Sequence, residues 1–403
     1  MNPCCIRSFY SFVENYLLMN PVRLNIISKA LLTGVLLLIC MNDSLAQEKF
    51  KLIQSNLILE TKAHYGFLIP HHREMDILNS HMSCWEFTIS KATYGRTRWE
   101  YMYDYPVIGL ALWYSDLGKS PYLGSGTAFY PYINFPLIRN RQTTLSFRLG
   151  VGLGYISKPF DRIENYKNIA IGSHLNAAVN LMFEYSLRMG ERFIVSGGMG
   201  LTHFSYGSMK TPNFGINIPS ISAGFAYRLS RENPYQRKKL MPELYPFEFD
   251  GKRFFNINLS LGFGFKNMEA EFGKRYFATT FFANVFKRIT YKSSIGLGFD
   301  LSYDESDKVI LEKKNIPFQN ELQIIRPGMN IAYEMIMSRF SIVANLGIYL
   351  GGKEKSDGDI YEKLAFKYHI SRLVFTNVTL KAHAARADYI AFGIGYRINV
   401  MYY

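Results

Sequence analysis

The sequence predicts an all-β fold, a transmembrane antiparallel β-barrel of an outer membrane with about 14–16 strands. Three observations predict it. Aromatic residues are abundant, with 29 Tyr and 31 Phe beside 31 Gly; apolar and polar residues alternate in segment after segment; and no stretch has the periodicity and caps of a long helix. A secreted soluble β-sandwich is the alternative, but near-zero mean hydropathy and an aromatic chain end favour the barrel.

The first 46 residues read as a cleaved signal peptide. Arg23 and Lys29 precede the apolar run 30–40, and small residues follow at Ser44 and Ala46. Met19 begins a more typical signal than Met1 does. Three of the 46 basic and two of the 32 acidic residues lie in this leader, which leaves the mature chain at +13. Three of the four cysteines also leave with it, so no internal disulfide can form.

The mature chain, 47–403, divides into segments with strand-like alternation. The best example is the last, in which apolar residues occupy the even positions from Ile390 to Tyr402 and small or polar residues occupy most of the others. The predicted strands are 57–69, 83–92, 107–116, 123–136, 144–156, 171–186, 191–205, 215–229, 253–266, 276–289, 292–304, 320–336, 338–350, 361–370, 373–383 and 388–401.

The clearest interruption is the proline-rich and charged stretch 231–250. We interpret it as a long connection between two halves of one barrel, 60–230 and 251–403. The halves share a faint echo, since Gly224 to Arg228 follows His203 much as Gly393 to Arg397 follows His383. This similarity is compatible with two eight-strand-like units, and also with the ordinary composition of barrel strands.

A polar group lies on an otherwise apolar strand face. His203 and Ser205 are two residues apart, so their side chains point the same way. They share the odd positions of 193–205 with Phe193, Val195 and other apolar residues, and Asn217 shares the apolar parity of the next strand. All three are therefore expected to face lipid, where polar groups are costly and usually functional.

The block from His203 to Asn217, HFSYGSMKTPNFGIN, resembles the signature of the PagL-type outer-membrane lipid A 3-O-deacylases, whose longer relatives are called acyloxyacyl hydrolases. Stretches 65–71, 158–161 and 168–176 resemble the longer relatives as well. The resemblance covers 60–230 well and the second half less specifically. It implies an outer-membrane esterase of a Gram-negative cell that removes an ester-linked acyl chain from lipid A.

By this resemblance, Ser205 is the nucleophile, His203 its general base and Asn213 a donor to the oxyanion. Two positions depart from the family pattern. Asn217 stands where the family has the acidic partner of the histidine, and Tyr206 where it has an Asn. An Asn can still orient a histidine; Asp161 or Glu164 could take over if their loop reaches the site.

The expected partners are lipid A, as part of lipopolysaccharide, and outer-membrane lipids. Lys210, Lys167 and Arg162 lie in predicted outer loops, where they either bind lipid A phosphates or are ordinary solvated charges. No phosphate loop, nucleophile elbow, metal motif or nucleic-acid reader is present in the sequence, so we expect no cofactor, no metal and no nucleic acid. The oligomeric state is left open.

The other histidines have less specific interpretations. His81 also forms a His-x-Ser pattern with Ser83, yet we interpret it, like His64, His71 and His72, as a rim or structural residue. His174 and its neighbour Ser173 point opposite ways, so His174 is expected in the lumen or in a structural hydrogen bond. The alternative function is a non-catalytic barrel, a channel or structural protein, that retains a decayed deacylase site.

Overall fold

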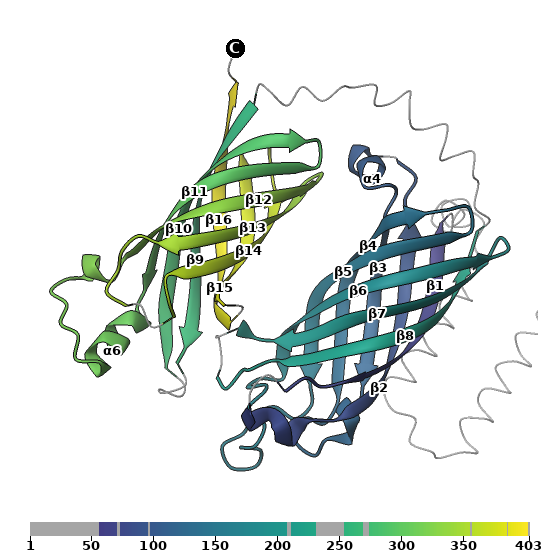
Figure 1. Ribbon diagram of the computed structural model, residues 1–403, viewed down its shortest axis with the longest axis horizontal. Coiled ribbons are helices and arrows are strands. Elements are labelled where there is room, and N and C mark those ends of the chain that lie inside the picture. Colours follow the sequence, from purple (N-terminus) through teal and green to yellow (C-terminus); the bar gives the residue numbers. More distant parts are fainter. Residues whose placement is uncertain are drawn as a thin grey trace, which may run out of the picture. The chain divides into compact units, whose positions relative to one another are not determined.

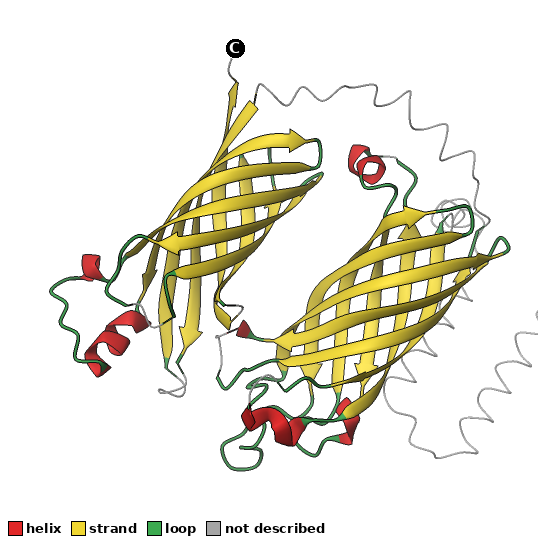
Figure 2. Cartoon of the chain, in the orientation of Figure 1, coloured by secondary structure: helices red, strands yellow, loops and turns green. Residues whose placement is uncertain are grey.

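The computed structural model describes residues 56–70, 73–95, 97–207, 211–230, 254–268, 274–354, 357–384 and 386–401. The predicted signal peptide, its two possible starts and the connection 231–250 lie outside these ranges. The described part contains sixteen strands and a few short helices (Figure 2). The predicted all-β class and the upper estimate of the strand number are confirmed.

The strands form two barrels, not the one that we expected (Figure 1). Residues 58–66 of β1 pair with β8, and 254–264 of β9 pair with β16, so each set of eight closes on itself. The first barrel contains β1 (Leu57–Phe67), β2 (His81–Ala92), β3 (Val107–Ser115), β4 (Gly126–Arg139), β5 (Thr143–Ile156), β6 (Leu175–Met189), β7 (Phe193–Ser205) and β8 (Ile216–Arg228).

The second barrel repeats this plan with antiparallel neighbours throughout. It contains β9 (Phe254–Asn267), β10 (Arg275–Thr290), β11 (Ser293–Asp304), β12 (Arg326–Met337), β13 (Phe340–Tyr349), β14 (Ile360–His369), β15 (Val374–His383) and β16 (Arg386–Met401). The predicted strand 320–336 begins six residues later, because residues 321–323 form a 3-10 turn.

Short helices occupy some of the loops. They are η1 (Arg73–Leu78), α4 (Arg98–Met102), η2 (Leu117–Lys119), α6 (Ser306–Lys313) and η5 (Glu321–Gln323). No helix in the described ranges is long and apolar enough to cross a membrane.

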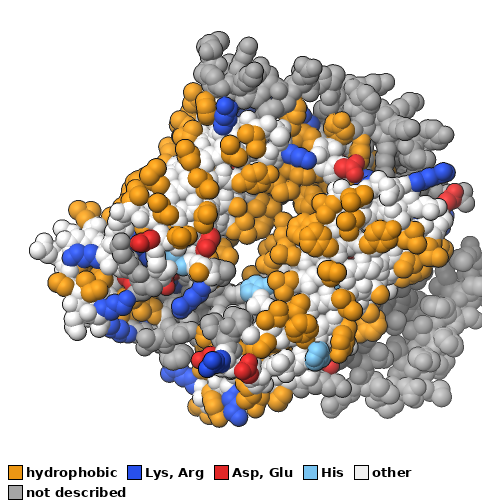
Figure 3. All heavy atoms as spheres, viewed as in Figure 1, with side chains coloured by type: hydrophobic (Ala, Val, Ile, Leu, Met, Phe, Trp, Pro, Cys, Tyr) orange, Lys and Arg blue, Asp and Glu red, His pale blue; other side chains and the backbone are white. Residues whose placement is uncertain are grey.

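The outer surface of both barrels is apolar, as the alternation predicts (Figure 3). Along β7, the side chains of Phe193, Val195 and Met199 are 46, 40 and 65% exposed, while Ser196 and Thr202 are buried inside. On β8, Ile221 and Phe225 are likewise exposed and Ala226 is buried. The predicted assignment of the odd positions of β7 and β8 to the outer face is therefore confirmed.

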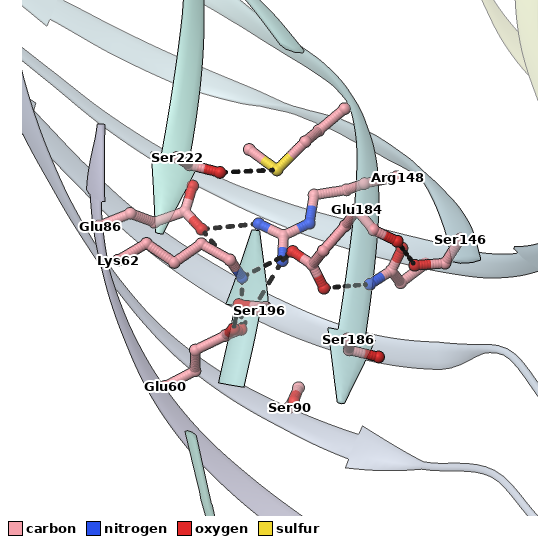
Figure 4. A network of polar contacts seen from close by, with 12 residues as sticks. Glu60, Lys62, Glu86, Ser90, Ser146, Arg148, Glu184, Ser186, Ser196 and Ser222 are labelled. Carbon is pink, nitrogen blue, oxygen red and sulfur yellow. Dashed lines mark hydrogen bonds and ion pairs between the residues drawn. The ribbon is translucent and has the colours of Figure 1, made fainter. Parts of the chain in front are cut away.

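The interior of the first barrel is filled by a buried ionic network (Figure 4). Arg148 donates to Glu86 at 2.6 Å and to Glu184 at 3.3 Å, and Lys62 pairs with Glu184 at 2.8 Å and with Glu60. All these charges come from strands of the same half of the chain. Eight strands enclose a space that side chains can fill, which is the physical reason that this half closes by itself.

An apolar cluster fills the barrel end that carries the β1–β2, β3–β4, β5–β6 and β7–β8 loops. Trp113 and Phe204 contact each other there, with ring centroids 5.5 Å apart. Ala170 and Ile171, from the loop between β5 and β6, are completely buried in this cluster. The loop thus folds over the barrel mouth and has a fixed position relative to β7 and β8.

Candidate active site

The end of β7 and the start of β8 place His203 and Asn217 opposite each other. They are direct partners in the strand register, and both are half-buried on the outer face. His203 Nδ1 lies 2.7 Å from Asn217 Oδ1. An amide oxygen at this distance accepts the Nδ1 proton, which leaves Nε2 as the basic nitrogen of the imidazole.

Ser205, the last residue of β7, lies on the same face as His203. Its Oγ accepts a hydrogen bond from Asn213 Nδ2 at 2.9 Å and one from the Gly207 backbone N–H at 3.1 Å. Asn213 also binds the turn itself, because its Oδ1 accepts from the Tyr206 N–H at 3.3 Å and its Nδ2 donates to the Gly207 carbonyl at 2.5 Å. Two donors therefore converge next to the serine oxygen.

This geometry clarifies the departure at Tyr206. The contact to Asn213 uses the backbone N–H of residue 206, which every residue except proline provides. The Tyr side chain in place of Asn therefore leaves this hydrogen bond in place.

Gly215 makes room for the histidine ring. Its φ is +86°, and a Cβ at this position would lie 2.9 Å from His203 Cε1. Both the backbone conformation and the contact require glycine. The sequence analysis assigned no role to Gly207 or Gly215, although both lie within the block that carries the resemblance.

The β5–β6 loop supports the β7–β8 loop. The backbone N–H groups of Phe214 and Gly215 donate to the carbonyls of Ile169 and Ala170 at 3.4 and 2.9 Å. Since Ala170 is buried in the barrel mouth, these bonds attach the segment that carries Asn213 to the interior of the barrel.

The structure brings together four of the predicted site residues, His203, Ser205, Asn213 and Asn217. Asp161 does not replace the missing acid, because Asn217 occupies the position next to Nδ1 and the Asp161 carboxylate accepts from the N–H groups of Ile163 and Glu164 at 2.8 and 2.9 Å. The Glu164 side chain is exposed.

The predicted phosphate ligands lie in loops. Arg162 and Lys167 are exposed on the β5–β6 loop, and Lys167 Nζ is 3.5 Å from the Tyr122 hydroxyl. Lys210 lies outside the described residues. The structure thus places two of the three on the loop that supports the site.

Other histidines have structural surroundings. His81 is at the rim and stacks on Tyr65, with centroids 5.9 Å apart; His64 is buried 4.0 Å from Glu86. The exposed His174 is within 2.9 Å of the Ile156 carbonyl, so its predicted hydrogen-bonding role is confirmed and a lumen position is wrong. His71 and His72 lie outside the described residues.

The second barrel has no outward histidine within its described residues. His369 and His383 both point into the lumen, and His383 Nε2 lies 3.0 Å from the Tyr349 hydroxyl. His383 is therefore not the counterpart of His203, which faces outward. The echo between the halves extends to strand number and closure but not to the catalytic group.

Comparisons with known proteins were made against families and structures. A family model described as "Lipid A 3-O-deacylase (PagL)" matches residues 85–226, and one described as "Acyloxyacyl hydrolase, C-terminal domain" matches residues 255–400. No curated protein gives a significant match. Two mutants of the porin of Rhodopseudomonas blastica align at 9% identity over 85% of this chain and 100% of theirs, with a TM-score of 0.17.

Proposed function

Since the chain belongs to the PagL family of lipid A 3-O-deacylases, we propose that its first barrel is an outer-membrane esterase that removes an ester-linked acyl chain from lipid A. The supporting observation is the arrangement on the outer face of β7 and β8. There the imidazole of His203 is oriented by Asn217, while the hydroxyl of Ser205 lies between two hydrogen-bond donors.

The chemistry follows from these contacts. His203 Nε2 accepts the proton of Ser205 as Oγ attacks the ester carbonyl, and Asn217 keeps the ring in the tautomer that permits this. The developing oxyanion is stabilised by Asn213 Nδ2 and the Gly207 N–H. His203 then protonates the leaving sugar oxygen, and water hydrolyses the acyl-enzyme.

The outward position of the site fits a lipid substrate. The acyl chain can lie along the apolar strand surface beside Ser205, where the neighbouring β6 contributes Ala177 and Val179. If the chain start is periplasmic, β7 ends at the outer leaflet, where lipopolysaccharide resides. Lys167, Arg162 and Lys210 are then the proposed ligands of its phosphates.

The fraction of filled interior argues against the channel alternative. In the first barrel Trp113, Tyr130, Arg148 and Phe204 are all less than 2% exposed, and in the second Phe286, Tyr361 and Tyr389 are similarly buried or nearly so. A conducting pore requires a wet path, which these side chains occupy.

The decisive experiment is mass spectrometry of lipid A from cells that express the chain or its variants. We expect loss of one acyl chain with the unmodified protein and no loss with Ser205→Ala or His203→Ala. The second outward His-x-Ser pair on β2 provides the matched control, so His81→Ala and Ser83→Ala should remain active. Unchanged lipid A with correctly inserted protein, or equal activity of Ser205→Ala, would reject the proposal in favour of a structural barrel.

A further inference from the structure

The loop between β5 and β6 contains a completely buried amide that the proposed reaction does not use. Asn168 Nδ2 donates to the carbonyls of Lys158 and Tyr122 at 2.7 and 3.3 Å. Its Oδ1 accepts from the N–H groups of Ala170 and Ile171 at 3.1 and 3.3 Å. All four hydrogen-bonding positions of the side chain are used, which is the arrangement of an amide that fixes its surroundings.

The segment that Asn168 fixes is the one that supports the β7–β8 loop. The carbonyl of Ala170 accepts the Gly215 N–H at 2.9 Å. Farther along, Gly172 approaches the other loop so closely that a Cβ there would lie 2.7 Å from the Pro212 carbonyl oxygen. Asn213 lies between these two contacts, so its backbone is held on both sides by the segment that Asn168 orders.

We propose that Asn168 is a positioning residue for the oxyanion donor: it orders residues 169–172, which hold Asn213 Nδ2 at the serine oxygen. This inference rests on the proposed deacylase activity and extends it to a residue that contacts neither the substrate nor Ser205. A preorganised donor stabilises the transition state only while its position is fixed, so a loosened loop lowers kcat and leaves KM nearly unchanged.

A double-mutant cycle tests this coupling. We expect Asn213→Ala to lower kcat by about 10²–10³-fold, as for the loss of one oxyanion donor. Asn168→Ala should lower kcat about 10-fold or more in the otherwise unmodified chain, but less than about threefold when Asn213 is already Ala, because coupled residues are not additive.

The matched control is Asn134→Ala. Asn134 is another buried amide of the first barrel, but it donates to Glu184 at 3.2 Å in the ionic network and touches neither loop. It should change stability with little effect on kcat. Equal effects of Asn168→Ala with and without Asn213 would assign Asn168 a purely structural role and overturn the proposal.

A second measurement does not depend on activity. Hydrogen–deuterium exchange of the full-length protein in detergent should show faster exchange of the Gly215 amide in Asn168→Ala, by roughly 10-fold, and no change in Asn134→Ala. Unchanged exchange at Gly215 would refute the positioning role even if the chain deacylates lipid A. Faster exchange in a chain without activity would support the positioning and reject only the esterase function.

Discussion

At the scale of single residues, the most consequential departure is the amide at position 217. Asn217 orients His203 but cannot stabilise an imidazolium as a carboxylate does. We therefore expect Asn217→Glu to keep or raise kcat, and Asn217→Ala to lower it by about 100-fold, within the usual contribution of acid–base catalysis. Kinetics on purified lipid A in mixed micelles would measure this. A glutamate that abolishes activity in a folded barrel would contradict the assignment.

Gly215 gives a second residue-scale prediction. Gly215→Ala should displace the imidazole and lower kcat at least 10-fold, because its Cβ would be 2.9 Å from the ring. Gly190→Ala is the matched control: its φ is also positive, at +73°, but nothing lies within 4 Å of the added Cβ. Both variants carry the backbone cost of about 1–2 kcal/mol. Equal kinetics of the two would show that the contact with His203 is unimportant.

The sequence could predict part of this site. Period-two alternation is sufficient to place His203, Ser205 and Asn217 on the same face, since that depends only on strand parity. The roles of Gly207, Gly215 and Asn168 depend on how two loops pack against each other. Nothing in the local pattern encodes that packing, so they became apparent only in three dimensions.

At the scale of elements, α6 is attached to the second barrel through a crowded group of carboxylates. Asp307, in α6, lies 3.2 Å from Arg326, and Asp304 and Glu354 approach the same guanidinium at 3.7 and 3.8 Å. Burial is the main cause that raises the pKa of Asp307 to about 8; the nearby Asp304 adds to the shift and Arg326 opposes it.

This shift predicts a pH-dependent attachment of α6. A carboxyl with a raised folded-state pKa favours the folded state in its protonated form, so that stabilisation decreases as the pH rises from about 4 through 8. Hydrogen exchange in residues 306–313, corrected for the intrinsic rate, should therefore accelerate between pH 6 and 9. Asp307→Asn should remove this dependence; an equal pH slope in that variant would show that another group is responsible.

At the scale of the whole molecule, the number of barrels was the main error of the sequence prediction. Alternation locates every strand but does not say whether β8 pairs with β1 or with β9, because the edges of all strands look alike. A signal was present in the lumen residues. Glu60, Lys62, Glu86, Arg148 and Glu184 neutralise one another within the first half, which is expected only if that half encloses its own interior.

Separate closure predicts that the first barrel folds alone. A chain of residues 47–230 should insert into detergent or lipid and show the heat-dependent gel migration of a folded barrel, because no strand edge is left unpaired. The matched chain 251–403 should do the same. If either fragment aggregates while the full-length chain folds, the two halves depend on each other during assembly.

The outward position of Ser205 has a kinetic consequence. A catalytic group on the barrel wall is reached by diffusion within the plane of the leaflet, not through an entrance from bulk water. The rate is then governed by the mole fraction of substrate among surrounding lipids. Diluting lipid A with an inert detergent at constant total concentration should slow the reaction, and an effective inhibitor must itself partition into the membrane.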